Sequence, residues 1–256
     1  MSRIATVLAA LAASLLFLFL TAPVARLVAA GGVAGVASLG VDAELRDALV
    51  LTAVTATTAT VIGALTGTPL AYLLARRRFR GHAVISALLD LPLLIPHPVA
   101  GIALLLTLGR TTPIGHALFA FGLRVAGSPT GIVAAMLFVS APLYLSGARE
   151  TFARVDARFE SVARTLGDSP LEAFRRVTLP LSGRGLIAAS IVMWARAVSE
   201  FGAIVILTYN PKVTSVLSYE RFTIYGLGQS LPVAAVLALL ALVPLIILRA
   251  LRSDTT

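Results

Sequence analysis

The stretch ESVARTLGDSPLEAFRRVTLP, residues Glu160–Pro180, is rich in charge but lies between two long apolar segments of the chain. Its pattern predicts two short helices separated by a turn. The first is expected over Asp156–Leu166 and ends before Gly167, because glycine readily takes the left-handed conformation that often follows a helix. We therefore expect a solvated helix–turn–helix between the apolar segments.

The start of the second short helix is marked by a capping box. Ser169 can act as the N-cap, Pro170 suits the first helical position, and Glu172 can bond back to the cap. A helix from Pro170 to about Val177 follows from this pattern. Pro180 is expected to end it, since proline lacks a backbone N–H and its ring crowds the preceding turn.

The composition of the chain indicates an integral membrane protein. Its 256 residues are 58% hydrophobic, with a mean hydropathy of +0.93 and only 13% charged residues, whereas soluble domains carry about 25% charge. The chain has no cysteine, which excludes disulfides, thiol catalysis and cysteine-ligated metal. The histidines, His82, His97 and His116, are too scattered for a metal site. We expect no resident metal.

Six apolar runs are long enough, or nearly so, to cross a bilayer, which takes about 20 residues. Each should be a helix, because lipid offers no partner for unpaired backbone groups. The first run exceeds the roughly 7–15 apolar residues of a secretory signal and is interpreted as an uncleaved helix. We therefore expect an all-α, polytopic protein whose six spans cover about 4–28, 48–75, 83–108, 129–148, 185–208 and 231–251.

Prolines should distort two of these spans. The third contains LPLLIPHPVAG, with Pro92, Pro96 and Pro98, and cannot be a regular helix throughout. Irregular backbone at membrane depth persists only where it is buried in protein or lines a water-filled cavity. In the fourth span, Pro142 is expected to introduce a kink.

The distribution of lysine and arginine predicts the orientation of the spans. With the N-terminus inside, fourteen of these residues lie on the inner side and six on the outer side, and inner loops carry the excess of positive charge. Both termini and the loop 149–184 are thus expected in the cytoplasm. Because the arginines lie at the ends of apolar runs, the net charge of +9 does not predict a nucleic-acid partner.

Two opposite charges are expected within the fifth span. Arg196 and Glu200 are four residues apart and can pair on one helix face. Ionisable residues at membrane depth mark functional sites by default, but a pair that only holds helices together is an equally open interpretation. His97, which follows Pro96 in the third span, is either a packing residue or a donor to a cavity.

The charged stretch resembles the EAA loop of binding-protein-dependent ABC importer permeases. That pattern is E-A-A, three residues, Gly, nine residues, an aliphatic residue, one residue and Leu-Pro. Here Ala163 matches the last alanine, Gly167 the glycine, Val177 the aliphatic residue and Leu179-Pro180 the closing pair.

Two positions depart from the EAA pattern. Ser161 stands where the family usually has Glu, and Val162 where it has Ala. Glu160 lies one residue early, and whether it replaces the missing acid is open.

The resemblance implies a type I permease fold in which the short second helix docks into a groove of a separate ATPase subunit. Phe174 would then be the apolar anchor, and Arg175 and Arg176 would form ion pairs at its rim. Without the resemblance, an amphipathic helix pair lying on the membrane surface remains possible. The residues expected to couple to the ATPase are Glu160, Ala163, Gly167, Ser169, Pro170, Leu171, Glu172, Ala173, Phe174, Arg175 and Pro180.

Other stretches resemble the molybdate/tungstate branch of these permeases, which is close to the sulfate branch. They are LDLPLLIPHPVAGIALLL (89–106), RAVSEFGAIVIL (196–207) and SVLSYERFTIYGLGQSLPVA (215–234). The resemblance implies one permease domain over residues 1–256, a homodimer, two ATPase subunits and an extracytoplasmic substrate-binding protein. That protein would land on the outside loops, about 109–128 and 208–230. A translocation pathway or gate is expected at Pro96, His97, Arg196 and Glu200.

The sequence shows no ATPase of its own. A P-loop needs G-x-x-x-x-G-K-[ST], and the single lysine, Lys212, lies in an expected outside loop. We therefore expect a transport subunit rather than an enzyme, with ATP and Mg²⁺ bound by the partner ATPase. Two alternatives remain: a permease for sulfate, thiosulfate or another anion, and a gradient-driven secondary transporter, which also uses broken helices.

Overall fold

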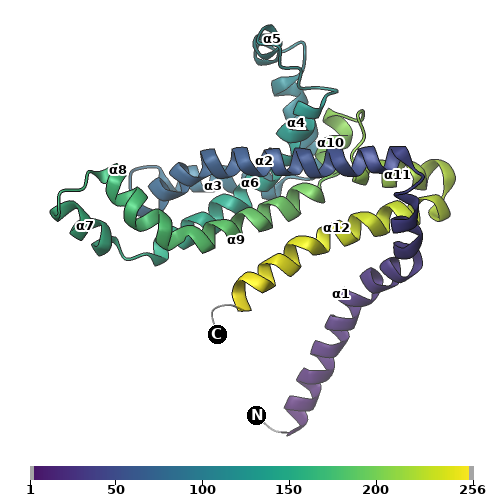
Figure 1. Ribbon diagram of the computed structural model, residues 1–256, viewed down its shortest axis with the longest axis horizontal. Helices are drawn as coiled ribbons and strands as arrows, with labels where there is room; N and C mark the ends of the chain where they lie inside the picture. Colours follow the sequence, from purple (N-terminus) through teal and green to yellow (C-terminus); the bar gives the residue numbers. More distant parts are fainter. Residues whose placement is uncertain (1–2, 254–256) are drawn as a thin grey trace.

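The computed structural model describes residues 3–253, which form helices and contain no strand (Figure 1). Within this part, five helices are long and apolar enough to cross a membrane, and the bent pair α3–α4 makes a sixth span. The elements are α1 (Arg3–Ser38), α2 (Ala43–Arg76), α3 (His82–Leu94), α4 (His97–Leu108), α5 (Pro113–Ala120), α6 (Pro129–Arg154), α7 (Ala157–Thr165), α8 (Pro170–Ala173), the π-helix η1 (Phe174–Thr178), α9 (Leu179–Val198), α10 (Gly202–Leu207), α11 (Thr214–Tyr225) and α12 (Leu227–Ser253).

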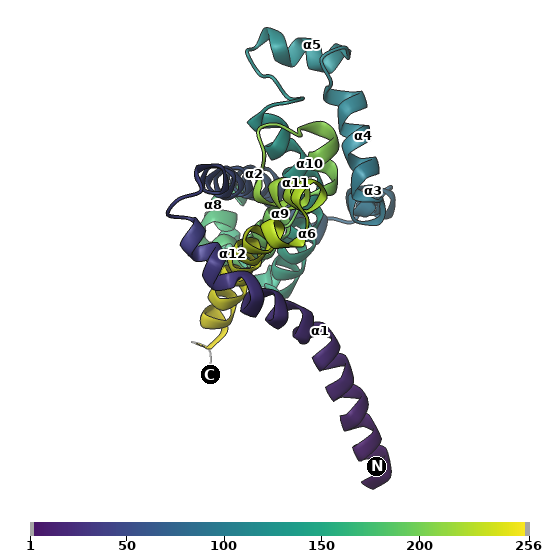
Figure 2. The ribbon, with the colours of Figure 1, turned by 90° about the vertical axis from the view of Figure 1, so that its right-hand side faces the viewer.

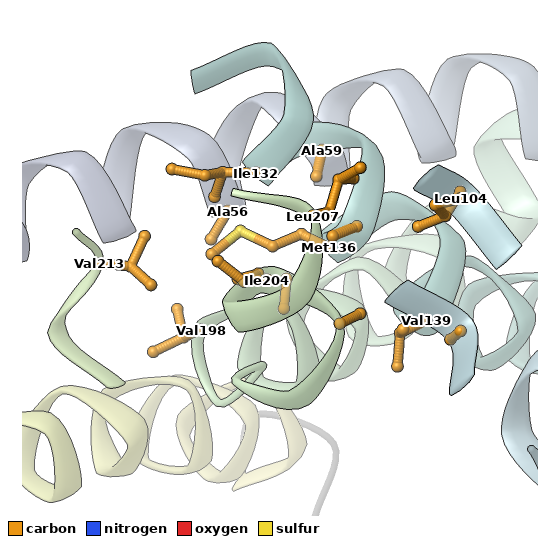
Figure 3. Packing of buried hydrophobic residues seen from close by; sticks show 14 of the residues in the cluster. Ala56, Ala59, Leu104, Ile132, Met136, Val139, Val198, Ile204, Leu207 and Val213 are labelled. Atoms are coloured by element: carbon orange, nitrogen blue, oxygen red, sulfur yellow. The ribbon is translucent and has the colours of Figure 1, made fainter. Parts of the chain in front are cut away.

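The centre of the molecule is a bundle of α2, α6 and α9, which run alongside one another in Figure 1. Its largest core cluster joins α2, α4, α6, α9 and α10 (Figure 3). Met136 and Ile132 of α6 meet Ile204 and Leu207 of α10 there, and all four are buried. The short segment α10 is thus part of the core, although it is too short to span a membrane.

Small and hydroxyl-bearing residues line the contacts of α2. Helices in lipid gain little from hiding apolar surface, so they associate through close packing and interhelical hydrogen bonds. A Cβ at Gly67 would lie 3.0 Å from the Tyr144 ring, and the Tyr144 hydroxyl is 2.6 Å from that of Thr68. Thr52 and Thr214 likewise bring their hydroxyls within 3.1 Å, which ties α2 to α11.

α1 contacts the rest of the chain mainly through α12. Gly31 and Gly35 lie one helical turn apart, and a Cβ on either would come within 2.6 Å of a backbone carbonyl oxygen of α12. The N-terminal half of α1 diverges from the bundle (Figures 1 and 2). Its most apolar window is 0% buried within the chain.

The third span is broken at one place only. α3 and α4 meet at an angle of 114°, with the break at Ile95 and Pro96. The other two prolines do not break a helix. Pro92 lies inside α3, and Pro98 lies in the first turn of α4, where a missing N–H removes no helical hydrogen bond. The expectation of an irregular third span is confirmed.

The fifth span is also broken, which the sequence interpretation missed. A continuous helix over 185–208 was expected, but α9 ends at Val198 and α10 starts at Gly202. No proline causes this break. The Glu200 carboxylate accepts the N–H of Ala203, and the Glu200 carbonyl accepts the hydroxyl of Ser215, so side chains replace the lost helical bonds.

Pro180 does not end the second short helix, which corrects the expectation. The N–H of Leu179 bonds to the carbonyl of Phe174, five residues back, and this wide π-turn leads directly into α9. Pro180 then occupies the first turn of α9 and has no helical partner to lose. Residues 170–198 therefore form one helix of 29 residues, which we call the rod.

Both segments that are expected on the outer side contain helices rather than only loops. α5 occupies part of 109–128, and α11 occupies much of 208–230. Figure 2 shows α4 and α5 projecting from the bundle.

The glycine contact between α1 and α12 should be sensitive to one added methyl group. Gly35→Ala places a Cβ against the backbone oxygen of Pro232, which cannot swing away, and we expect a loss of about 1–3 kcal/mol of stability. Gly228→Ala is the matched control, because its added Cβ meets no atom within 4 Å. Thermal unfolding in one detergent should show a lower midpoint for Gly35→Ala alone, and equal midpoints would contradict the contact.

Candidate functional site

Two groups of polar side chains lie near the two ends of the rod. The loop cluster consists of Tyr72, Arg76, Glu160 and Thr178. The break cluster consists of His97, Arg196, Ser199 and Glu200. The rod forms a continuous helical connection between the two clusters.

The helix–turn–helix has the local structure that its sequence predicts. Asp156 caps α7 by accepting the N–H of Arg158 at 2.9 Å. Gly167 has φ +107°, which an L side chain rarely adopts. Ser169 and Glu172 form the capping box at the start of the rod, with bonds of 2.8 and 3.3 Å.

The loop cluster fixes the helix–turn–helix to the bundle through Glu160. Its carboxylate accepts from the Tyr72 hydroxyl at 2.7 Å, from the Arg76 guanidinium at 2.9 and 3.1 Å, and from the Thr178 hydroxyl. Arg76 also donates to the carbonyl of Val155 at 2.8 Å. Four segments, α2, the turn after α6, α7 and η1, are thus joined by one ion pair.

The electrostatics of the loop cluster keep Glu160 ionised. Burial raises its pKa, but the hydrogen bonds from Thr178 and Tyr72 and the charge of Arg76 outweigh that effect, so the pKa lies below its ordinary value of 4.5. The expected coupling acid therefore points into this chain and holds α7 in place.

Phe174, expected as the exposed apolar anchor, also turns inward. Its ring packs 4.7 Å from the Tyr72 ring and 6.1 Å from the Phe152 ring, measured between centroids. Arg176 pairs with Asp168 of the same chain at 2.6 Å.

The outward surface of the helix–turn–helix carries a different apolar set. Phe159 and Val162 lie on one face of α7, Leu166 caps the C-terminal end of that helix, and Leu171 lies just across the turn. Each of the four is at least 55% exposed. We call these four residues the apolar patch. The i, i+3, i+7 spacing of the first three could have been found in the sequence. Ala163 is half-buried, and the remaining expected coupling residues Pro170, Glu172, Arg175 and Pro180 are exposed, whereas Ala173 is buried.

The break cluster brings together all the residues expected at membrane depth. Arg196 donates to the Glu200 carboxylate at 2.8 Å and to Nε2 of His97. Nε2 of His97 lies 3.9 Å from the same carboxylate, and Pro96 directly precedes His97 at the cap of α4. The pairing of Arg196 with Glu200 is confirmed.

Two glycines that the sequence interpretation passed over bring the broken spans together. A Cβ at Gly202 would lie 2.7 Å from Cβ of His97, and one at Gly101 would lie 2.7 Å from the carbonyl oxygen of Ala203. Close approach of α4 and α10 requires glycine at both positions. Their presence in FGAIVIL and PVAGIAL was the available signal.

A second network, on the side expected to face outward, was also missed. Lys212 pairs with Glu44 at 2.9 Å and with Glu220 at 2.5 Å, and Arg221 pairs with Asp42 at 2.6 Å. Hydrogen bonding from Arg221 lowers the pKa of Asp42. These ion pairs tie the start of α2 to α11. Partners so distant in sequence give no local signal.

The loop cluster should contribute stability that depends on pH. Glu160→Gln removes the charge, and we expect a loss of about 1–3 kcal/mol at neutral pH. Because the pKa of Glu160 is lowered on folding, its contribution is present above pH 4.5 and lost as the pH falls through the lower value. The gap between wild type and variant should therefore close in acid.

Thermal unfolding in detergent between about pH 3 and pH 8 measures this gap. Glu150→Gln is the control, because Glu150 is 70% exposed in its pair with Arg154, and such pairs contribute about 0–1 kcal/mol. A gap for Glu160→Gln that is independent of pH would contradict the assignment.

Residues 67–255 match the family described as "Binding-protein-dependent transport system inner membrane component". The chain is 43% identical over 208 residues to the molybdate/tungstate transport system permease protein WtpB of Thermococcus kodakarensis, covering 81% of this chain and 79% of that protein. It is 34% identical to a probable molybdenum ABC transporter permease protein of Haloferax volcanii, covering 95% and 89%.

The fold is shared with a solved structure. A chain of a bacterial ABC transporter that imports the acidic polysaccharide alginate superimposes with a TM-score of 0.72 at 18% identity, covering 99% of this chain and 97% of that one. The family match covers both broken spans, the rod and the helix–turn–helix. The chain is thus a membrane-spanning component of the binding-protein-dependent transport family.

Proposed function

We propose that this chain is the permease subunit of an ATP-driven importer for a tetrahedral oxyanion, molybdate or tungstate. The observation that carries the proposal is the rod, which leads from the exposed apolar patch to the charged break between two spans. Two of the relatives described above have names that refer to molybdate or molybdenum transport, which supports the choice of ion.

The apolar patch is the surface that we assign to the ATPase. Its four side chains are exposed at the end of the rod, and apolar surface of this kind on a soluble loop is typical of protein interfaces. Two ATPase subunits would bind one permease dimer, and they would hold ATP and Mg²⁺. Leu171, at 65% exposure, replaces Phe174 as the expected anchor.

The remaining partners follow from the other faces of the molecule. The N-terminal half of α1 is apolar and leaves the bundle, so we assign it to lipid and to a second copy in a homodimer. An extracytoplasmic binding protein would land on α5, α11 and the ion pairs of Lys212 and Arg221. The excess of arginine supports cytoplasmic positions for both termini and for the loop 149–184.

Transport would then proceed by alternating access. ATP binding would close the ATPase dimer and move the two apolar patches towards each other. The rods would carry this motion to the break cluster, and the spans would change from inward-open to outward-open. Pro96, His97, Arg196 and Glu200 would lie at the moving joint, as pathway or gate residues.

The broken spans favour one other class. Secondary transporters also place discontinuous helices and buried charges at mid-membrane. A gradient-driven mechanism would leave the apolar patch without a partner. Sulfate or thiosulfate remain alternative substrates, since they resemble molybdate in shape and charge.

Uptake into liposomes tests the function. The chain would be reconstituted with its ATPase and binding protein and given labelled molybdate, tungstate or sulfate, with and without ATP. We expect uptake of molybdate and tungstate that needs both ATP and the binding protein. Uptake driven by an ion gradient without ATP would overturn the proposal.

The anchor assignment predicts different effects for two apolar residues. Leu171→Asp should weaken ATPase binding about tenfold or more, because it places a charge in an apolar contact, while leaving the permease as stable as wild type. Phe174→Ala should lower the stability of the permease by about 3–5 kcal/mol, because the ring packs inside the chain.

Two measurements separate these effects. Titration with the purified ATPase gives the binding affinity, and thermal unfolding of the permease alone gives its stability. Arg164→Asp is the control, because Arg164 is exposed on α7 beside the patch. If Leu171→Asp binds the ATPase with wild-type affinity, the patch is not the docking surface.

A further inference from the structure

In the break cluster, the hydrogen-bond donors are more exposed than the acceptor. Its acceptor, the Glu200 carboxylate, is 1% exposed, whereas the donors Arg196 and His97 are 22% and 44% exposed. The carboxylate already accepts from Arg196 and from the N–H of Ala203. A species approaching the cluster therefore meets hydrogen-bond donors and not the negative charge.

The contact with Arg196 fixes the tautomer of His97. A guanidinium can only donate, so Nε2 of His97 must accept from Arg196 and the proton of the neutral ring lies on Nδ1. Within residues 3–253, no hydrogen bond engages Nδ1. Nδ1–H of the partly exposed imidazole is thus a free donor, on the side of the ring away from the guanidinium.

Arg196 has donor capacity to spare. It carries five N–H groups, and its contacts with Glu200, His97 and Ser199 within the described residues engage three of them. A planar guanidinium with free N–H groups matches the oxygens of a tetrahedral anion. Pairing with Glu200 reduces its charge but holds it in position.

We propose that Arg196 and Nδ1–H of His97 form a transit site for a tetrahedral oxyanion at the joint of the two broken spans. This inference rests on the proposed function and adds a contact site for the transported anion. During passage the anion would accept from the two donors in succession, first on one side of the imidazole ring and then on the other, while Glu200 keeps its buried partners. Gly101 and Gly202 maintain the site by letting α4 and α10 approach.

The buried carboxylate suits a site that must release its ligand. An unpaired arginine in a poorly solvated site would hold a dianion too strongly, and conduction needs binding that is favourable enough to enter yet weak enough to leave. Glu200 offsets one positive charge, so affinity comes from hydrogen-bond geometry more than from net charge.

The test separates passage of the anion from coupling to ATP. Arg196→Gln with Glu200→Gln in one chain removes both charges and leaves an amide, which can still form hydrogen bonds, at each position. In the complete transporter in liposomes, we expect ATP hydrolysis stimulated by the binding protein to stay within about twofold, while molybdate and tungstate uptake falls about tenfold or more.

His97→Gln provides a second variant that leaves the ion pair of Arg196 and Glu200 intact. It should show the same separation, with a smaller loss of uptake of about threefold to tenfold. If the double variant does not fold, this variant decides the question. Arg184→Gln, an exposed arginine elsewhere on the rod, is the control and should match wild type in both assays.

Each outcome is informative. Uptake at the wild-type rate by both variants would show that the cluster only holds helices together. Parallel losses of uptake and ATP hydrolysis would show that it is a mechanical joint without anion contact. Either result overturns the transit site but leaves the proposed function standing. Absence of ATP-dependent oxyanion uptake by the wild type would overturn both.

Discussion

Backbone that leaves a helix at membrane depth must find polar partners within the protein, because lipid provides none. This constraint shapes the chain at its two broken spans. Glu200 satisfies it with both its carboxylate and its carbonyl, which accept from Ala203 and Ser215. The breaks at Pro96 and Glu200 lie against each other, so one buried acid serves as the polar centre for α4, α9, α10 and α11.

The rod connects this centre to the exposed helix–turn–helix at the other end of the bundle. A proline at position 180 would be expected to interrupt a helix, but the π-turn of η1 widens the backbone so that Pro180 starts α9 instead. The loop cluster then holds η1, within the rod, against α2 and α7.

Features that depend on neighbouring residues were predictable from the sequence. The capping box at Ser169, the left-handed Gly167, the six spans and the Arg196–Glu200 pair all follow from short spacings. What could not be predicted depends on partners far apart in the chain. Phe174 turns inward because Tyr72 and Phe152 offer aromatic faces, and the fifth span breaks without a proline because a side chain replaces the helical bond.

The central claim is that residues 170–198 move as one body. Spin labels at Arg175 and Val192, both exposed positions of a chain without native cysteine, would lie about 25 Å apart along a continuous helix. Pulsed electron resonance on the complete transporter would measure this distance with and without a trapped ATP analogue. We predict the same distance in both states. A change of about 5 Å, roughly one helical turn, would show that η1 is a hinge and would contradict it.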